Sequence, residues 1–108
     1  MHQLPPPIAR YIAAANAQDA HAVAAAFRAD GAVHDEGHQH RGQRAIAAWA
    51  DASARQYGAT IAPQGLEQDG ARCTVRAAVS GNFAGSPITL GFHFVLGVDV
   101  IDSLEITP

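Results

Sequence analysis

The sequence contains no lysine and only one cysteine. Its seven basic residues are all arginines, they are scattered without a basic run, and the formal net charge is −3. Binding to nucleic acid requires a positively charged stripe, so this charge pattern argues against that class of partner. The single cysteine, Cys73, has no second cysteine with which to form an intrachain disulfide.

Long hydrophobic runs are also missing. No apolar run approaches the roughly 20 residues needed to span a bilayer, and the N-terminal MHQLPPPIARY lacks the charged-then-apolar pattern of a secretory signal. We therefore expect a soluble cytoplasmic protein without a membrane partner. The 108 residues, 48% hydrophobic and 16% charged, suit one globular domain spanning residues 1–108.

Large apolar residues at helical spacing predict three helices, although the abundant alanines fit either face of a helix and set no phase. The first covers roughly residues 6–17 and puts Tyr11 on its buried face. Asp19 is a suitable N-cap for the second helix, which we expect to end at Asp30-Gly31. The third covers roughly residues 43–57.

The rest of the chain reads as strands and turns. Residues 32–35 form a short extended piece, and residues 37–42 are predicted to be a loop. From Ala59 onward apolar residues alternate with polar ones, as on a sheet with one buried face. The predicted strands cover residues 66–68, 71–81, 88–96 and 100–106. Helices followed by a meander indicate an α+β domain with helices on one face of a bent antiparallel sheet.

The segment AVHDEGHQHRG, residues 32–42, gathers three of the six histidines beside two acids. Val33 and Asp35 lie two apart in an extended piece, so both side chains project to the same side. His38 and His40 could present two imidazoles to a zinc or iron ion. No HExxH or similar spacing is present, and a solvated loop that gates a cavity is the favoured interpretation.

Four strings resemble the nuclear transport factor 2-like superfamily, and within it ketosteroid isomerases and SnoaL-like polyketide cyclases. They are YIAAANAQDAHAVAAAFRADGAVHDEG, GQRAIAAW, GNFAGSPITLGFHFVL and IDSLEI. The resemblance covers most of the chain. It implies a cone, in which a curved sheet wraps over three helices around one apolar cavity. It also implies a homodimer packed through the outer face of the sheet.

The resemblance further implies roles for two residues. Asp35 matches the general base of ketosteroid isomerases, and Tyr11 matches the tyrosine that donates to the developing oxyanion. A carboxylate can take a proton from the carbon next to a carbonyl, and a phenol in a dry pocket stabilises the resulting oxyanion. Burial is expected to raise the pKa of Asp35. The structural alternatives are that Tyr11 fills the core and that Asp35 is a turn residue bonded to backbone.

The same resemblance and the alternation of residues suggest which side chains line the cavity. The expected substrate-binding residues are Phe27, Val33, His38, His40, Trp49, Leu90, Phe92 and Phe94. Leu90 occupies the position at which isomerases carry a second oxyanion donor, a protonated aspartate. Losing one such donor typically costs about 2.7–4 kcal/mol of transition-state stabilisation. His93 alternates with Phe92 and should face away from the cavity.

Three functions are consistent with these residues. The first is an enzyme that binds a small hydrophobic carbonyl compound and moves protons as an isomerase or cyclase does, without a metal or another cofactor. The second is a binding domain in which the same cavity only holds an apolar molecule. The third is a metal-dependent activity centred on His38 and His40.

Overall fold

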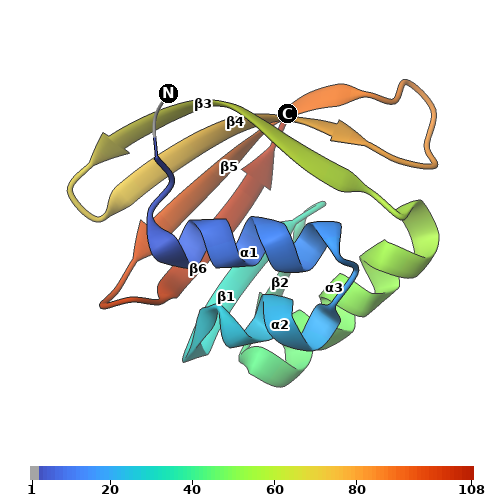
Figure 1. Cartoon of the computed structure of the whole chain (residues 1–108). Helices are drawn as coiled ribbons and strands as arrows, with labels where there is room; N and C mark the ends of the chain where they lie inside the picture. Colours follow the sequence, from blue (N-terminus) through green and yellow to red (C-terminus); the bar gives the residue numbers. More distant parts are fainter. Residues whose placement is uncertain (1–2) are drawn as a thin grey trace.

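The computed structural model describes residues 3–108, which form one six-stranded sheet and three helices (Figure 1). The helices are α1 (Pro6–Asn16), α2 (Ala20–Ala25) and α3 (Gln43–Tyr57). The strands are β1 (Phe27–Asp35), β2 (His38–Arg41), β3 (Thr60–Asp69), β4 (Arg72–Ser80), β5 (Ile88–Leu96) and β6 (Ile101–Thr107). The expected α+β class is confirmed. No helix within residues 3–108 has both the length and the apolar character needed to cross a membrane.

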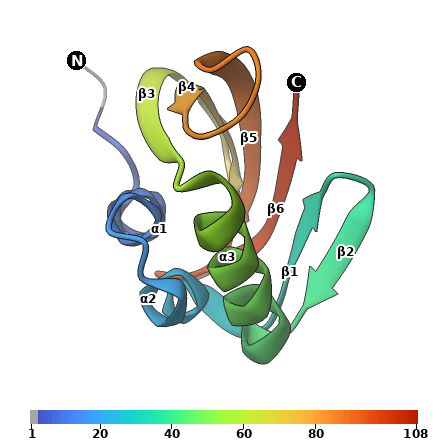
Figure 2. The ribbon, with the colours of Figure 1, turned by 90° about the vertical axis from the view of Figure 1, so that its right-hand side faces the viewer.

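The sheet has the strand order β2-β1-β6-β5-β4-β3. Neighbouring strands are antiparallel except for β1 and β6, which run parallel and join the N-terminal half of the chain to the last strand. The sheet curves around α3, and the helices cover its concave face (Figure 2). The expected bent sheet is therefore present, with one parallel pair that alternation alone did not indicate.

Helices α1 and α3 follow the predicted boundaries closely. Prolines precede and begin α1, where a missing N–H leaves no helical bond unmade, and its inner face buries Ile8 and Tyr11. Helix α3 ends at Tyr57 and is capped by Gly58, whose φ of 56° is a left-handed conformation that glycine adopts without strain. Asp19 caps α2, as expected, by accepting a hydrogen bond from the Ala22 backbone N–H at 3.1 Å.

The second helix is shorter than predicted. It ends at Ala25, and Phe27 begins β1 by pairing with Ile101 of β6. The predicted end at Asp30-Gly31 is wrong because both residues lie within β1, beside a register shift between Phe27 and Ala32. Alanines in this stretch give no helical phase, so pairing with β6 decides where the helix ends.

The predicted loop at residues 37–42 is also wrong. Apart from the turn at Gly37, it contains β2, whose register pairs Asp35 with His38 and Ala32 with Arg41. An edge strand held by backbone hydrogen bonds needs no buried face, and most side chains of β2 are exposed. The sequence therefore shows no hydrophobic alternation there to reveal the strand.

The predicted meander is confirmed, with a first strand longer than expected because β3 begins at Thr60. The core lies between the concave face of the sheet and the helices. Its fully buried members include Ile8, Phe27, Val33, Ile46, Val75, Phe94, Ile101 and Leu104. Cys73 is also buried, as a small apolar residue would be.

Candidate functional site

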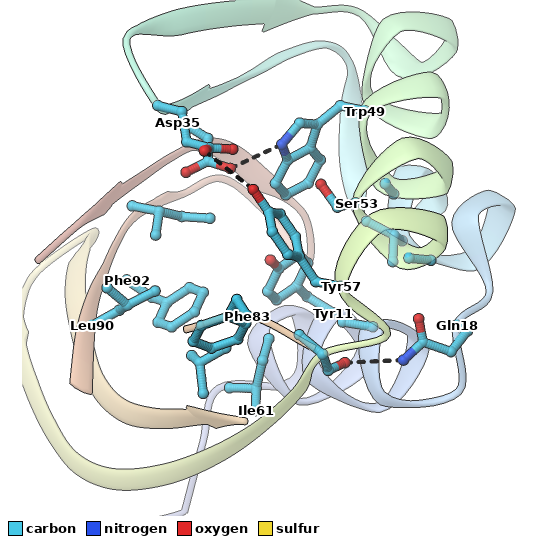
Figure 3. A pocket seen from close by; sticks show the side chains of 18 of the residues that line it. Tyr11, Gln18, Asp35, Trp49, Ser53, Tyr57, Ile61, Phe83, Leu90 and Phe92 are labelled. Carbon is cyan, nitrogen blue, oxygen red and sulfur yellow. Dashed lines mark hydrogen bonds between the residues drawn. The ribbon is translucent and has the colours of Figure 1, made fainter. Parts of the chain in front are cut away.

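A pocket of about 440 Å³ opens between α3, α1 and the inner face of β5. Figure 3 shows Trp49, Ser53 and Tyr57 projecting from one side, with Leu90 and Phe92 opposite them. The volume lies within the range that holds small organic ligands. The walls are largely apolar, through Ile61, Val79, Phe83, Ile88, Leu90, Phe92 and several alanines. The polar residues of the wall are Tyr11, Gln18, Asp19, Asp35, Glu36, Trp49, Ser53, Tyr57 and Thr107, although the Thr107 hydroxyl itself bonds to His93.

Asp35 is the last residue of β1 and is half-buried at the polar end of the pocket. Its carboxylate accepts a hydrogen bond at 3.1 Å from the indole Nε1–H of Trp49 on α3 (Figure 3). Burial raises the pKa of Asp35 above its usual 3.8, and the neighbouring Glu36 charge adds to the rise. The Trp49 bond and His40 oppose that rise. Desolvation dominates, which suits a carboxylate that accepts a proton.

Tyr11 stands on the inner face of α1, and only 2% of the residue is exposed. Its ring packs edge-on against Phe27 and Phe94, with centroids 6.1 and 5.7 Å away. Figure 3 draws no hydrogen bond to its hydroxyl, yet residues 3–108 contain no fully buried polar side-chain atom without a partner. The hydroxyl therefore borders the open space of the pocket. The ring of Tyr11 therefore packs in the core, while its hydroxyl group is available to donate a hydrogen bond to a ligand.

The electrostatic environment keeps the Tyr11 phenol protonated. Burial raises its pKa, and the nearby Asp35 charge raises it further. A second negative charge in the same dry space is unfavourable, so the phenol retains its proton and remains a hydrogen-bond donor. Asp35 and Tyr11, 24 positions apart in the sequence, thus face one pocket as an acceptor of protons and a donor of hydrogen bonds.

Of the ten residues predicted for the site, the structure brings five to the pocket wall. They are Tyr11, Asp35, Trp49, Leu90 and Phe92. Leu90 offers no polar atom, so β5 supplies no second oxyanion donor at that position. His93 points to the outer face of the sheet, as predicted, where it bonds to Thr74 and Thr107.

The other five predicted residues do not line the pocket. Phe27, Val33 and Phe94 are buried in the core, where the Tyr11 ring of α1 packs against Phe27 and Phe94. His38 is exposed on β2, and His40 lies against the Trp49 ring with centroids 6.0 Å apart. Both histidines pair with inward-facing residues of β1 and so share that face of the sheet, but β2 is the edge strand and neither side chain lines the pocket. Within residues 3–108 no three His, Cys, Asp or Glu side chains are placed to hold a metal ion.

Sequence reasoning missed Glu36, Tyr57 and Phe83, which lie together at the mouth of the pocket. The Tyr57 hydroxyl donates a hydrogen bond at 3.4 Å to the Glu36 carboxylate, and its ring meets Phe83 edge-on at 5.9 Å. Glu36 is exposed, and the sequence carries no pattern that predicts its contact with Tyr57. One signal was available, since Tyr57 continues the four-residue spacing of Trp49 and Ser53 along α3.

Several solved structures are similar to this chain. A candidate polyketide cyclase from Sinorhizobium meliloti shares 36% identity over 96% of this chain and 95% of its own, with a TM-score of 0.92. A protein of ketosteroid isomerase-like fold from Catenulispora acidiphila, solved with trimethylamine, shares 18% identity over 98% of this chain and 87% of its own, with a TM-score of 0.88. SalBIII, an epoxide hydrolase/cyclase-like enzyme of pyran-ring formation in salinomycin, shares 23% sequence identity over 94% of this chain and 86% of its own, with a TM-score of 0.79.

A search among curated proteins finds no match. The sequence pattern of the SnoaL-like domain matches residues 8–103, which is most of the chain and includes Tyr11, Asp35 and the strands opposite them. The fold and this match agree with the resemblance seen in the sequence. The chain therefore belongs to the SnoaL-like domain family.

Proposed function

We propose that the protein is a cofactor-independent isomerase or cyclase that moves protons on a small hydrophobic carbonyl compound. One observation carries the proposal: Asp35 and the free hydroxyl of Tyr11 face the same largely apolar pocket. Family membership supports it, and so do the descriptions of the Sinorhizobium protein and of SalBIII as cyclase-type proteins. The small molecule held by the Catenulispora protein is consistent with a ligand-binding pocket.

The chemistry follows from the two groups. The Asp35 carboxylate takes a proton from the carbon adjacent to the substrate carbonyl, and the C–H electron pair moves to form an enolate. The negative charge develops on the carbonyl oxygen, which accepts a hydrogen bond from the Tyr11 hydroxyl. Asp35 then returns its proton to another carbon, which completes an isomerisation. In a cyclase the enolate carbon instead forms a bond to a second carbonyl carbon of the same molecule, the π electrons of that carbonyl move to its oxygen, and Asp35 returns its proton to the resulting alkoxide.

The leucine at position 90 narrows the range of substrates. With Tyr11 as the donor and no acid on β5, the pocket stabilises an enolate less than a two-donor site does. We infer that the natural substrate is acidic at the reacting carbon, as in a 1,3-dicarbonyl compound or a β,γ-unsaturated ketone. Simple ketones should react slowly.

Hydrogen–deuterium exchange tests the proton transfer without knowledge of the natural substrate. In deuterated water, the protein should accelerate exchange at the acidic carbon of 2-tetralone, followed by NMR. Asp35→Asn should remove the acceleration, and Tyr11→Phe should reduce it by about 100- to 1,000-fold, the range for loss of an oxyanion donor. Unchanged exchange in Asp35→Asn would contradict the proposal.

A control variant tests whether exchange depends on Asp35 itself or on any carboxylate of the protein. Glu67 is an exposed acid on β3 that does not line the pocket, so Glu67→Gln should leave exchange unchanged. If wild-type protein binds tetralone but never exchanges its protons, the pocket only binds its ligand. The apolar Leu90 favours that second candidate function, a non-catalytic small-molecule-binding domain.

We also propose that the protein forms a homodimer through the outer face of the sheet. That face carries small or half-buried side chains at its centre, among them Thr74, Gly91 and His93. Sedimentation of the wild-type chain should give twice the monomer mass. Thr74→Arg, which adds a bulky charge on that face, should return the mass to that of a monomer.

A further inference from the structure

Two consecutive acids, Asp35 and Glu36, both line the pocket. In a regular strand, neighbouring side chains point to opposite faces, so one of the two should point away. The backbone at Glu36 has a φ of 52°, a left-handed conformation that non-glycine residues seldom adopt. This turn between β1 and β2 brings the second carboxylate to the same space as the first. Such conformations concentrate at functional sites.

The charge of the pocket wall is entirely acidic. Among the described lining residues are Asp19, Asp35 and Glu36, and there is no arginine or histidine. Several arginines are engaged elsewhere on the surface. Arg10 pairs with Asp99, Arg28 with Asp30 and Asp102, and Arg55 with Asp51. A carboxylate, phosphate or sulfate on a ligand would therefore meet negative charge without a compensating cation.

Aromatic rings complete the mouth of the pocket. Tyr57 donates to Glu36 across 3.4 Å, a long and exposed contact that a ligand can replace. Phe83 stands edge-on to Tyr57, and both rings line the pocket, with the Tyr57 hydroxyl next to the Glu36 carboxylate and Phe83 farther from it (Figure 3). A carboxylate next to aromatic faces is a favourable environment for an ammonium group, because ring faces attract cations.

At the other end of the pocket, the Tyr11 hydroxyl independently determines a second property of the ligand. The hydroxyl of Tyr11, a residue only 2% exposed, faces the pocket and has no hydrogen-bond partner among residues 3–108. It requires an acceptor such as a carbonyl oxygen. The pocket thus has a place for an acceptor at Tyr11 and a place for a cation at Glu36.

We propose that Glu36 determines the charge preference of the pocket, which takes carbonyl compounds bearing an ammonium group and rejects those bearing an acid group. The carbonyl end of this assignment rests on the proposed function, whereas the charge preference depends only on Glu36 and the rings beside it. Glu36 acts in binding and does not take part in proton transfer. Amino ketones are the substrate class that satisfies both ends.

Three matched ligands test the charge preference directly. They are 2-tetralones that carry an aminomethyl, a hydroxymethyl or a carboxylate group at the same ring position, with binding measured by NMR titration at pH 7. Wild-type protein should bind the ammonium form at least tenfold more tightly than the carboxylate, with the neutral form between them. Glu36→Gln should reduce that ratio severalfold. Raising the salt concentration should reduce it too, because Glu36 is exposed and its charge is screened.

Matched variants make the result specific. Glu67→Gln removes the same charge from β3, outside the pocket, and should leave the ratio unchanged. Equal affinity for the three ligands, tighter binding of the carboxylate, or no binding of the ammonium form at millimolar concentration would each overturn the proposal. A ratio that survives Glu36→Gln would also overturn it.

The two proposals fail in different ways. If the charge ranking holds but Asp35→Asn leaves exchange intact, the catalytic mechanism is wrong and Glu36 keeps its binding role. If exchange depends on Asp35 while the three ligands bind equally, the mechanism stands and the assignment of amino ketones fails.

Discussion

The side chains of β5 that face the helices run from a filled half of the interior to a hollow half, and their exposure differs between the two. Phe94 and Phe92 are 2% and 3% exposed, Leu90 is half-buried, and Ile88 is 40% exposed. The strand and the face are the same, so the difference comes from what stands opposite. The Tyr11 ring packs against Phe94 and is itself backed by Phe27, whereas the wall facing Leu90 is rich in small residues.

Alanine is what leaves the second half hollow. Five alanines line the pocket, namely Ala15, Ala20, Ala50, Ala54 and Ala59. They support helices well but present only a methyl group to the interior. The composition that obscured the helical phase in the sequence is thus the physical origin of the pocket. The filled half stabilises the fold, and the hollow half is free for a ligand.

The largest effect should come from the filled half. Phe94→Ala should lower the free energy of unfolding by about 3–5 kcal/mol, because it leaves a cavity among packed rings. Leu90→Ala, four residues away, should cost less than about 1.5 kcal/mol, since that side chain already borders open space. Urea denaturation measures both values. Equal losses would remove the distinction between the two halves.

The next largest effect concerns two hydrogen bonds between the Asn16 side chain and the Ile61 backbone, beside the hollow half. The Asn16 side chain donates to the Ile61 carbonyl at 3.0 Å and accepts from the Ile61 N–H at 2.7 Å. These bonds fix the end of α1 to the edge strand β3. Asn16→Ala should cost about 1–3 kcal/mol, at 0.5–1.5 kcal/mol for each bond. Gln18→Ala removes one exposed bond to Ala59 and should cost less.

A smaller effect depends on pH. The pKa of Asp35 is raised in the folded protein, so the folded state binds the proton more tightly than the unfolded state does. Stability contributed by Asp35 is therefore lost as the pH rises from about 3.8 through the folded pKa. Asp35→Asn should stabilise the protein at pH 7 by less than about 1 kcal/mol, because the group is only half-buried.

Thermal denaturation at pH 7 and pH 3 checks this sign. The advantage of Asp35→Asn should vanish at pH 3, where the wild-type carboxyl is protonated in both states. A variant that is less stable at pH 7 would mean that the Trp49 hydrogen bond outweighs burial. Proton-transfer activity should fall on the acid side at a pH above that of an ordinary aspartate, since only the carboxylate is a base.

The smallest effect on stability should accompany a large effect on binding. Ala54→Leu places three additional carbons in the pocket on a helix that accepts leucine readily. We expect the free energy of unfolding to change by less than about 1 kcal/mol and the affinity for tetralones to fall at least tenfold. Ala52→Leu, on an exposed position of α3, is the matched control. Strong destabilisation by Ala54→Leu would mean that this half is already well packed.

The sequence predicted those elements whose side chains carry a periodic pattern. The alternation of Leu90, Phe92 and Phe94 gave β5 and its inner face, and the resemblance directed attention to Tyr11 and Asp35. Strand β2 was missed because HQHR pairs through its backbone and buries no face. The end of α2 was missed because the alanines favour a helix but give no apolar phase that shows where it stops, and pairing of Phe27 with Ile101 decides that point.

The site was predicted less completely than the fold. The resemblance named one acid, but the left-handed turn at Glu36 that brings in a second is a backbone conformation rather than a pattern of residue types. Tyr57 and Phe83 meet through packing between a helix end and a distant loop. Such contacts depend on the finished tertiary structure, which periodicity does not encode.

The parallel pairing of β1 with β6 affects how the protein folds during its synthesis. Val33, two residues before the proposed base, pairs with Leu104, so the strand that carries Asp35 is flanked by a segment synthesised about 70 residues later. On the ribosome, the helices can form while Asp35 still lacks its neighbour in the sheet. The nascent chain should therefore acquire its secondary structure early and its chemistry only when β6 has left the exit tunnel.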